Sequence, residues 1–190
     1  STPVFGVPGY PVSAIIAMEQ FVVPLLARMQ GVHAPPPVSV KAVLARDLPS
    51  RAGIEEFRRM IAGKIGGNYV ATPLKKGAGA ITSMTRANAI LRIDARSEGA
   101  LGGSELDIEL LTPLSQVERT ILCTGSHDLS LDILNDQLRK RDPAFFLAST
   151  HVGSFGGIMA IRQGMCHIAG SHLLEPRDGS YNVTALKQYL

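Results

Sequence analysis

The sequence predicts a mixed multi-domain protein in three parts. These are the terminal strand and helix of an α/β domain (residues 1–36), a small all-β barrel (37–112) and a partial α/β lobe with a parallel sheet (113–190). Residues 38–112 hold short apolar runs between glycine corners, whereas residues 118–190 alternate strand-like and helix-like segments. The charge changes at the same place, from 11 basic and 8 acidic residues over 38–112 to 7 of each over 113–190.

The first segment predicts a strand end, a turn and one helix. VFGVPGYP supplies the turn, and Ser13 is placed to cap or open the helix. Gly31 closes the helix, and Pro24 inside it predicts a kink or a restart. Apolar residues recur near helical spacing, namely Ile15, Ile16, Phe21, Val22, Leu25, Leu26 and Met29. One helix and a strand end form no core, so we expect this segment to pack on another part of a longer protein.

We expect no membrane segment and no secretory signal. The run AIIAM is stopped by Glu19 and Gln20, far short of the roughly 20 apolar residues of a membrane span. No basic stretch precedes an apolar one, as a signal peptide requires. The chain does not begin with Met, so we expect a fragment or a trimmed chain, and its exposed apolar faces predict association.

The middle segment predicts a small barrel or sandwich. VHAPPP (32–37) is a stiff linker, and strand-like runs follow at 38–45, 64–74, 80–84, 89–94 and 105–111. Gly66–Gly67, Lys75–Gly79 and Gly102–Gly103 mark the corners. Short strands with glycine corners over about 75 residues are typical of small barrels.

The last segment predicts βαβ units. Strands are expected at 121–125, 144–150 and 166–170. Ser126 opens a helix with Leu131, Leu134 and Leu138 on one face. A glycine-rich turn at 153–157 leads into a short helix ending near Gly164, and VTALKQYL forms the last helix.

The amino-acid composition argues against some classes of function and favours others. Aromatic residues are 5% and Trp is absent, which argues against nucleic-acid binding by base stacking. A net charge of +3 is mild and favours a small anionic ligand. Cys123 and Cys166 stand in apolar runs, so we interpret both as buried core residues. Two cysteines exclude a disulfide-rich scaffold and a four-cysteine zinc module.

Polar residues follow each predicted strand of the last segment. Ser126, His127 and Asp128 follow the first, His151, Gly153 and Ser154 the second, and Ser171 and His172 the third. Ligands of open parallel sheets bind at the carboxyl ends of the strands, and free N–H groups of helix N-termini there favour anions. The same residue types also serve as ordinary helix caps. Three histidines with an aspartate also fit a zinc site, although their spacing is not a metal signature.

Two stretches resemble known families. FGVPGYPVSAIIAMEQFVVPLL resembles the end of the pterin-binding domain of molybdopterin molybdenumtransferases, whose pattern is roughly GxPGNPVSAxxxxxxFVxP, with Tyr10 where Asn is commonest. EEFRR (55–59), TPLKKGAGAITSMTRANAIL (72–91) and GGSELDIELL (102–111) resemble motifs of that family's C-terminal barrel. GSHDLSLDIL, STHVGSFGGIMAIRQG and HIAGSHLLEPRDGSYN resemble the start of a type-2 periplasmic-binding-protein-like domain, which some of these enzymes carry at the C-terminus.

The resemblance implies insertion of molybdate into adenylylated molybdopterin with Mg²⁺, in a cytoplasmic protein that we expect to be a homodimer, with no nucleic acid and no membrane as partner. The residues it implies for the pterin ligand are Pro8, Gly9, Pro11, Ser13, Arg59 and Ser83. Arg59, Lys75 and Lys76 supply the cations that a phosphate requires, although such charges also occur on solvated strands, and the prolines alternatively fix only the backbone. No paired carboxylates that could hold Mg²⁺ are apparent in the sequence, so we expect this chain alone to be inactive. The alternative function is a non-catalytic module in which Ser126, His127, Asp128, His151, Gly153, Ser154 and His172 bind a small oxyanion.

Overall fold

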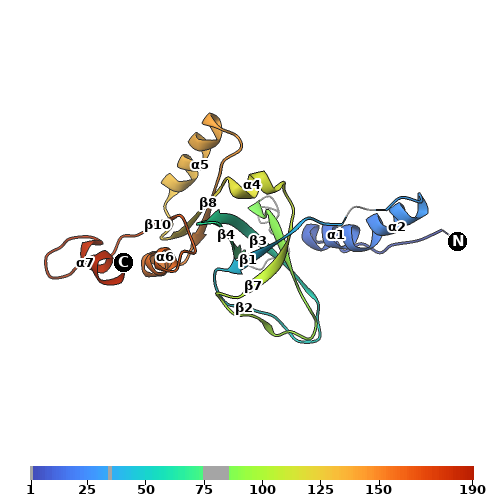
Figure 1. Cartoon of the computed structure of the whole chain (residues 1–190), viewed down its shortest axis with the longest axis horizontal. Coiled ribbons are helices and arrows are strands. Elements are labelled where there is room, and N and C mark those ends of the chain that lie inside the picture. The colour runs from blue at the N-terminus through green and yellow to red at the C-terminus, as the bar shows by residue number, and fades with distance from the viewer. Residues whose placement is uncertain (1, 34–35, 75–85) are drawn as a thin grey trace.

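A computed structural model describes residues 2–33, 36–74 and 86–190. Three bodies follow one another along the chain (Figure 1): an N-terminal helix on one side, a β-barrel in the middle and an α/β lobe on the other side. The mixed architecture predicted from the sequence is confirmed, with a helix first, a five-stranded barrel next and a parallel βαβ sheet last.

The N-terminal helix is continuous from Pro11 to Met29 and consists of α1 (Pro11–Ala17), η1 (Met18–Val22) and α2 (Val23–Met29). Tyr10 is its N-cap and Pro11 occupies the first turn, so the expectation that Ser13 caps the helix is wrong. Residues 2–9 form no strand, which corrects the predicted strand end. Gly31, at φ +68°, ends the helix as predicted, with Val32 N–H donating to Ala27 O.

Pro24 is accommodated by a π-helical turn instead of a break. Proline lacks the N–H that would close the regular helical bond four residues back. The five residues before Val23 widen into a π turn, and the Val23 N–H donates to Met18 O. Helices commonly absorb a proline through such a bulge.

The helix continues past Glu19 and Gln20, the two polar residues that end the apolar run AIIAM in the sequence. Its 19 residues have a mean hydropathy of 1.5, so by length and composition alone they are sufficient to cross a membrane. A helix that packs inside a larger protein meets the same criteria. Many of its large apolar side chains are exposed, including Ile15, Met18, Phe21, Val23, Leu26 and Met29.

The barrel closes in the order β1–β4–β3–β5–β7. Its strands are β1 (Ser39–Leu44), β3 (Glu56–Ile65), β4 (Asn68–Pro73), β5 (Ala89–Ile93) and β7 (Glu105–Leu110). β1 pairs in parallel with β4, and the other pairs are antiparallel. A separate two-stranded sheet joins β2 (Leu48–Pro49) to β6 (Gly99–Ala100).

The barrel interior is a continuous apolar core. Alternate residues of β3, Met60 and Ala62, point into it together with Leu44, Leu91 and Ile108. Most of β3, the longest strand, was not predicted, because its charged start hides the alternation. Arg58 and Arg59 are both buried, and inward-facing Arg58 pairs with Glu56 at 3.0 Å. The strand predicted at 80–84 lies outside the described residues.

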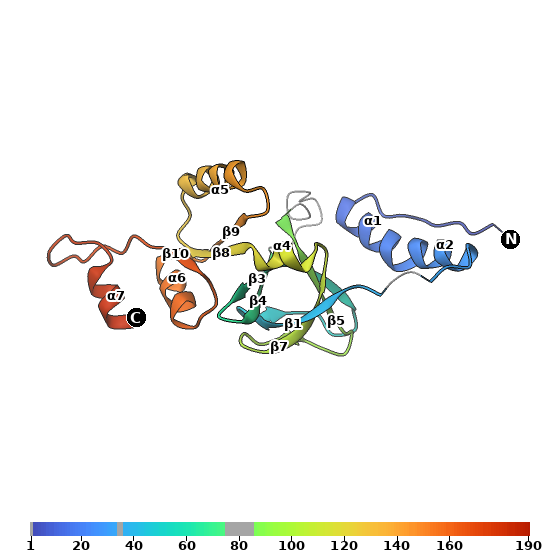
Figure 2. The same cartoon turned by 45° about the horizontal axis from the view of Figure 1, so that its top comes forward.

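The lobe contains a parallel sheet of order β10–β8–β9, as the alternation predicted. Its strands are β8 (Thr120–Gly125), β9 (Phe146–His151) and β10 (Ile168–Gly170). Its helices are α5 (Leu129–Arg141), α6 (Gly153–Arg162) and α7 (Val183–Tyr189), and α4 (Leu114–Glu118) connects it to the barrel. Figures 1 and 2 show α5 and α6 on opposite sides of the sheet.

Two helix starts differ from the expectation. Asp128, not Ser126, caps α5, because its carboxylate accepts the Ser130 N–H at 2.7 Å. The glycine-rich stretch 153–157 is the first turn of α6 and not a turn before it. Gly157 allows this helix to approach β8, since a Cβ there would lie 2.7 Å from Thr124 O.

The lobe is joined to the outer face of the barrel by a second apolar cluster. Ile61 and Val70 of the barrel pack with Leu122, Ala148 and Cys166 of the lobe. Both cysteines are buried, as expected. His167 is exposed and bridges the two bodies: its Nδ1 accepts the Leu122 N–H at 2.9 Å, and its Nε2 lies 2.9 Å from Lys64 O.

Candidate functional site

The carboxyl ends of β8 and β10 form a topological switch point of the lobe sheet. The chain leaves β8 for β9 on one side and returns from β9 to β10 on the other side of β8. Connections that leave neighbouring strands in opposite directions open a crevice at the carboxyl edge, where open α/β sheets bind ligands. Ser126 follows β8 and His172 lies two residues after β10, so both are placed at this crevice.

Ser126, Ser154 and His172 meet at this edge from three different segments. His172 Nδ1 lies 3.0 Å from Ser126 Oγ and 3.3 Å from Ser154 Oγ. The His172 backbone N–H donates to Ser154 Oγ at 3.1 Å. Because the Ser154 oxygen already accepts this hydrogen bond, its own O–H is directed to the ring nitrogen or to a ligand. Ser154 is 8% exposed, and the other two are more accessible.

His127 and His151 lie at the same edge and contact each other. Their ring centroids are 4.0 Å apart at an interplanar angle of 36°. Both are exposed, and each can add positive charge to the edge when protonated. Gly153 begins α6 with φ +79°, a conformation that glycine adopts without strain.

Asp128 has a defined role as a helix cap. Hydrogen bonds from Ser130 hold the pKa of its carboxyl below the ordinary value, and the positive charge of His127 acts in the same direction. It therefore stays ionised and brings a negative charge beside the three histidines. No group of three or more His, Cys, Asp or Glu able to hold a metal ion occurs among residues 2–33, 36–74 and 86–190.

Asn182 holds the loop that carries His172, although it was not among the predicted site residues. Its Oδ1 accepts from Ser171 Oγ at 3.0 Å and from Leu173 N–H at 2.8 Å, and its Nδ2 donates to Ser171 O at 3.1 Å. It adopts φ +66°, which Asn tolerates better than most residues. An Asn directly before a helical run was the one available signal, and it is a weak one.

The barrel holds a second group of predicted site residues around Arg59. This side chain is buried, and burial lowers its pKa, with Arg58 adding repulsion. Arg46 shows the same direction for the same two reasons, and its guanidinium donates to Pro73 O at 2.7 Å. Arg46 and Arg59 are therefore partly desolvated cations, whereas Arg58 beside them is paired with Glu56. Ser83, Lys75 and Lys76 lie outside the described residues.

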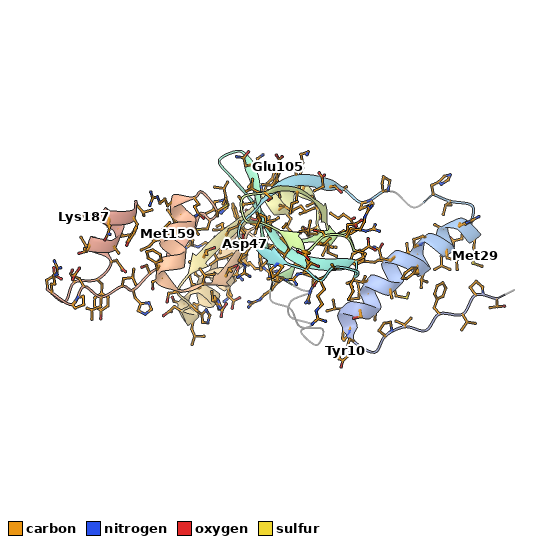
Figure 3. The ribbon with its side chains drawn as sticks, turned by 90° about the horizontal axis from the view of Figure 1, so that it is seen from below. Tyr10, Met29, Asp47, Glu105, Met159 and Lys187 are labelled. Atoms are coloured by element: carbon orange, nitrogen blue, oxygen red, sulfur yellow. The ribbon has the colours of Figure 1, made fainter. Side chains whose placement is uncertain are left out.

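Pro8, Gly9, Pro11 and Ser13 lie at the start of the N-terminal helix. Figure 3 labels Tyr10 in the middle of this turn, on the side of the barrel away from Met159 and Lys187 in the lobe. The structure therefore brings the lobe residues together but places the turn residues and the lobe cluster on opposite sides of the barrel (Figures 1 and 3).

Several carboxylates gather around one pocket on the barrel surface. A surface pocket of about 360 Å³ is lined by Ser39, Glu55, Arg92, Asp94, Asp107 and Glu109. Arg92 pairs with Glu55, and Arg96 pairs with Asp94 at 3.1 Å and lowers its pKa. Because these cations already neutralise two of the carboxylates, the pocket does not fit the Mg²⁺ implied by the resemblance.

Comparison with known proteins identifies two regions. Residues 41–111 match the model of the MoeA C-terminal region (domain IV), and residues 135–190 match that of the PBP superfamily domain. A molybdopterin biosynthesis MoeA protein from Pyrococcus horikoshii OT3 shares 39% identity over 54% of this chain and 26% of its own, with a TM-score of 0.46. A molybdenum cofactor biosynthesis protein from Pyrococcus furiosus shares 36% over 54% of this chain and 36% of its own, with a TM-score of 0.47. This chain thus spans about a quarter to a third of those proteins.

Proposed function

We propose that this chain, whose residues 41–111 match the MoeA C-terminal region and whose residues 135–190 match the PBP superfamily domain, belongs to a molybdenumtransferase. In the complete protein this enzyme inserts molybdate into adenylylated molybdopterin. The protein acts in the cytoplasm as a homodimer, and it requires Mg²⁺ held by residues other than those described here.

The match of residues 41–111 to that C-terminal region carries the proposal. The physical chemistry of the barrel supports it. The ligand is anionic, and Arg46 and Arg59 are cations that are partly removed from water. Guanidinium groups in such places bind phosphate more strongly than exposed lysines do. In this proposal Arg59 and Ser83 contact the pterin phosphate, and the turn with Pro8, Gly9, Pro11 and Ser13 positions it.

The test uses the longer protein that includes the upstream domains. Molybdate-dependent cofactor maturation is measured for the parent protein and for Arg59→Ala and Ser83→Ala, with Arg51→Ala, an exposed arginine, as the matched control. We expect both site variants to lose at least tenfold in activity and the control to keep it. Circular dichroism verifies folding. Unchanged activity in both site variants would refute the roles of these residues, and no maturation by the parent protein would refute the function.

A second function is favoured by the convergence of Ser126, Ser154 and His172. Two hydroxyls and an imidazole converge within 3.3 Å at the carboxyl edge of a parallel sheet, beside the N-terminus of the ten-residue helix α6. Preset donors of this kind replace the hydration shell of an oxyanion. We propose that the lobe binds molybdate or a related oxyanion here, with His127, His151 and Gly153 at its rim.

Calorimetry tests this site directly. Molybdate, tungstate and sulfate are titrated into the chain and into the double variant Ser126→Ala/Ser154→Ala. The expected result is binding by the parent chain and at least a tenfold loss of affinity in the double variant. Ser130→Ala, which keeps the backbone N–H bonded to Asp128, is the control and should bind like the parent. Equal affinity in the double variant would place the anion elsewhere.

A further inference from the structure

A second cavity lies at the junction of the barrel and the lobe, at the opposite edge of the lobe sheet. Its volume is about 110 Å³, and barrel residues, α4 and the segment from α5 to β9 all contribute to its lining. The polar side chains that matter here are Arg86, Arg139, Thr112 and Gln116. Liquid water occupies about 30 Å³ per molecule, so this cavity accommodates about four waters or one group of similar size.

Thr112 carries the first observation that points to a ligand. Among the described residues, its Oγ1 is the buried side-chain polar atom for which no hydrogen-bond partner is present. A buried hydroxyl without a partner destabilises the fold, and such groups in native proteins call for an explanation. Two polar side chains of the lining are already engaged: Asn88 bonds the backbone of Ala62, and Thr120 Oγ1 donates to Gln116 O. The orphaned hydroxyl therefore has its proton available to a guest in the cavity.

The charge of the lining is the second, independent observation. Arg86 comes from the barrel side and Arg139 from the last turn of α5, and no carboxylate occurs among the described residues that line the cavity. Asp142, the acidic residue at the C-cap of α5, forms a salt bridge with Arg119 at 3.1 Å. Lys140 and Arg141 stand in the same last turn and offset the negative end of the helix dipole.

We propose that this cavity is a second anion site, which binds a phosphate group between Arg86 and Arg139 while the Thr112 hydroxyl donates to one of its oxygens. A phosphate has five heavy atoms and fits the available volume. Two guanidinium groups and one hydroxyl are the donors that phosphate recognition uses. The group comes either from inorganic phosphate or from a small phosphate ester whose remainder extends into solvent.

The site is separate from the cluster of Ser126, Ser154 and His172. Thr120 and Phe146, which line the cavity, are the first residues of β8 and β9, whereas Ser126 and His151 stand at the far ends of the same strands. Six residues of strand span about 17–20 Å. A phosphate at this junction contacts both barrel and lobe elements, so its binding is expected to stabilise their relative position.

The experiment is a calorimetric titration of inorganic phosphate into the Ser126→Ala/Ser154→Ala chain, in which the other site is disabled, in buffer free of phosphate and sulfate. We expect one binding event that weakens with added salt. Arg139→Gln should lower the affinity at least tenfold, and Thr112→Val about threefold or more. The matched control Arg141→Gln, a neighbouring cation that does not line the cavity, should bind within twofold of the parent. A parallel titration with glycerol 3-phosphate distinguishes inorganic phosphate from a phosphate ester as the ligand. Tighter binding of glycerol 3-phosphate would show that the glycerol part of the ester also contacts the protein.

Stability without phosphate provides a second readout that does not depend on the ligand. Thr112→Val removes the orphaned hydroxyl at equal volume, so its melting temperature should equal or exceed that of the parent in phosphate-free buffer. In saturating phosphate the order should reverse, because only the parent gains fully from the ligand. The proposal is overturned if phosphate gives no binding up to about 10 mM, or if Arg139→Gln and Arg141→Gln weaken it equally, which would indicate diffuse attraction.

Discussion

At the scale of single residues, the candidate oxyanion site depends on where His172 is held. Asn182 fixes the loop on both sides of this residue through Ser171 and Leu173. The histidine and the serines were predictable, because polar residues after strands are a recognisable pattern. The role of Asn182 was not predictable, because its three hydrogen bonds join residues 9 to 11 positions apart and produce no periodic pattern in the sequence.

Replacing Asn182 with Ala should lower oxyanion affinity at least fivefold while the lobe remains folded, because the ring of His172 loses its fixed position. Calorimetry with molybdate measures this effect. Asn135→Ala is the matched control: its Oδ1 accepts the Leu147 N–H at 2.8 Å, away from the site. That variant should lose stability and keep the affinity. Equal affinity losses in the two variants would show that Asn182 acts only through general stability.

Asn88, which stands in the barrel motif that resembles the family, has a structural role in this fold. Its side chain pairs with both backbone groups of Ala62 and lies 3.3 Å from Thr120 Oγ1. Asn88→Ala leaves two buried backbone groups unpaired and should lower the free energy of unfolding by about 2–4 kcal/mol. Denaturant unfolding measures it. Asn68→Ala, at an exposed strand end, should change stability by less than about 0.5 kcal/mol.

Glu118 links α4 to the barrel and makes stability depend on pH. Hydrogen bonds from Lys64 at 2.7 Å and Tyr69 at 2.9 Å lower the pKa of its carboxyl below the ordinary value of 4.5. The unfolded chain therefore takes up a proton first as pH falls, and this contribution to stability is present above about pH 5 and lost below the lowered pKa. Glu118→Gln should remove that part of the pH dependence in unfolding curves between pH 3 and 6. An identical pH profile would exclude the contribution.

At the scale of elements, the sequence is most informative where one face is buried and least where charges enter the core. β8, β9 and β10 were predicted within two residues because each is a short apolar run. β3 was largely missed because Arg58 and Arg59 interrupt its pattern, and both are buried through tertiary contacts. The N-terminal helix ends at Gly31 as predicted, whereas Pro24, expected to cause a kink or a restart, is accommodated by a π turn.

The close approach of α6 to β8 gives the prediction at this scale. A Cβ on Gly157 would lie 2.7 Å from Thr124 O and 2.8 Å from Gly125 Cα. Both are backbone atoms, so the helix must move. Gly157→Ala should cost about 1–3 kcal/mol in unfolding experiments and displace Ser154, which weakens oxyanion binding. Gly6→Ala, with no atom within 4 Å of its Cβ, should leave both properties unchanged. An equally stable Gly157→Ala chain would contradict this packing.

At the scale of the whole molecule, the three bodies separate two kinds of candidate residues. The turn at Pro8–Pro11 and the lobe cluster lie on opposite sides of the barrel (Figures 1 and 3). Local sequence patterns indicated each body but not this arrangement, which depends on the apolar contact of Ile61 and Val70 with Leu122. The N-terminal helix and α5 both expose apolar residues, so association of this chain with itself or with another protein remains a prediction.

The central claim is that the carboxyl edge of the lobe sheet holds an oxyanion, and ring nitrogen NMR of the five histidines tests it most directly. Each histidine of the chain reports on a different place, with His127, His151 and His172 at the edge and His33 and His167 elsewhere. Titration with molybdate should shift the Nδ1 resonance of His172 most, shift those of His127 and His151 less, and leave the other two unchanged. Saturable shifts that leave the His172 resonance unchanged, or no shift of any histidine resonance, would contradict an oxyanion site at this edge.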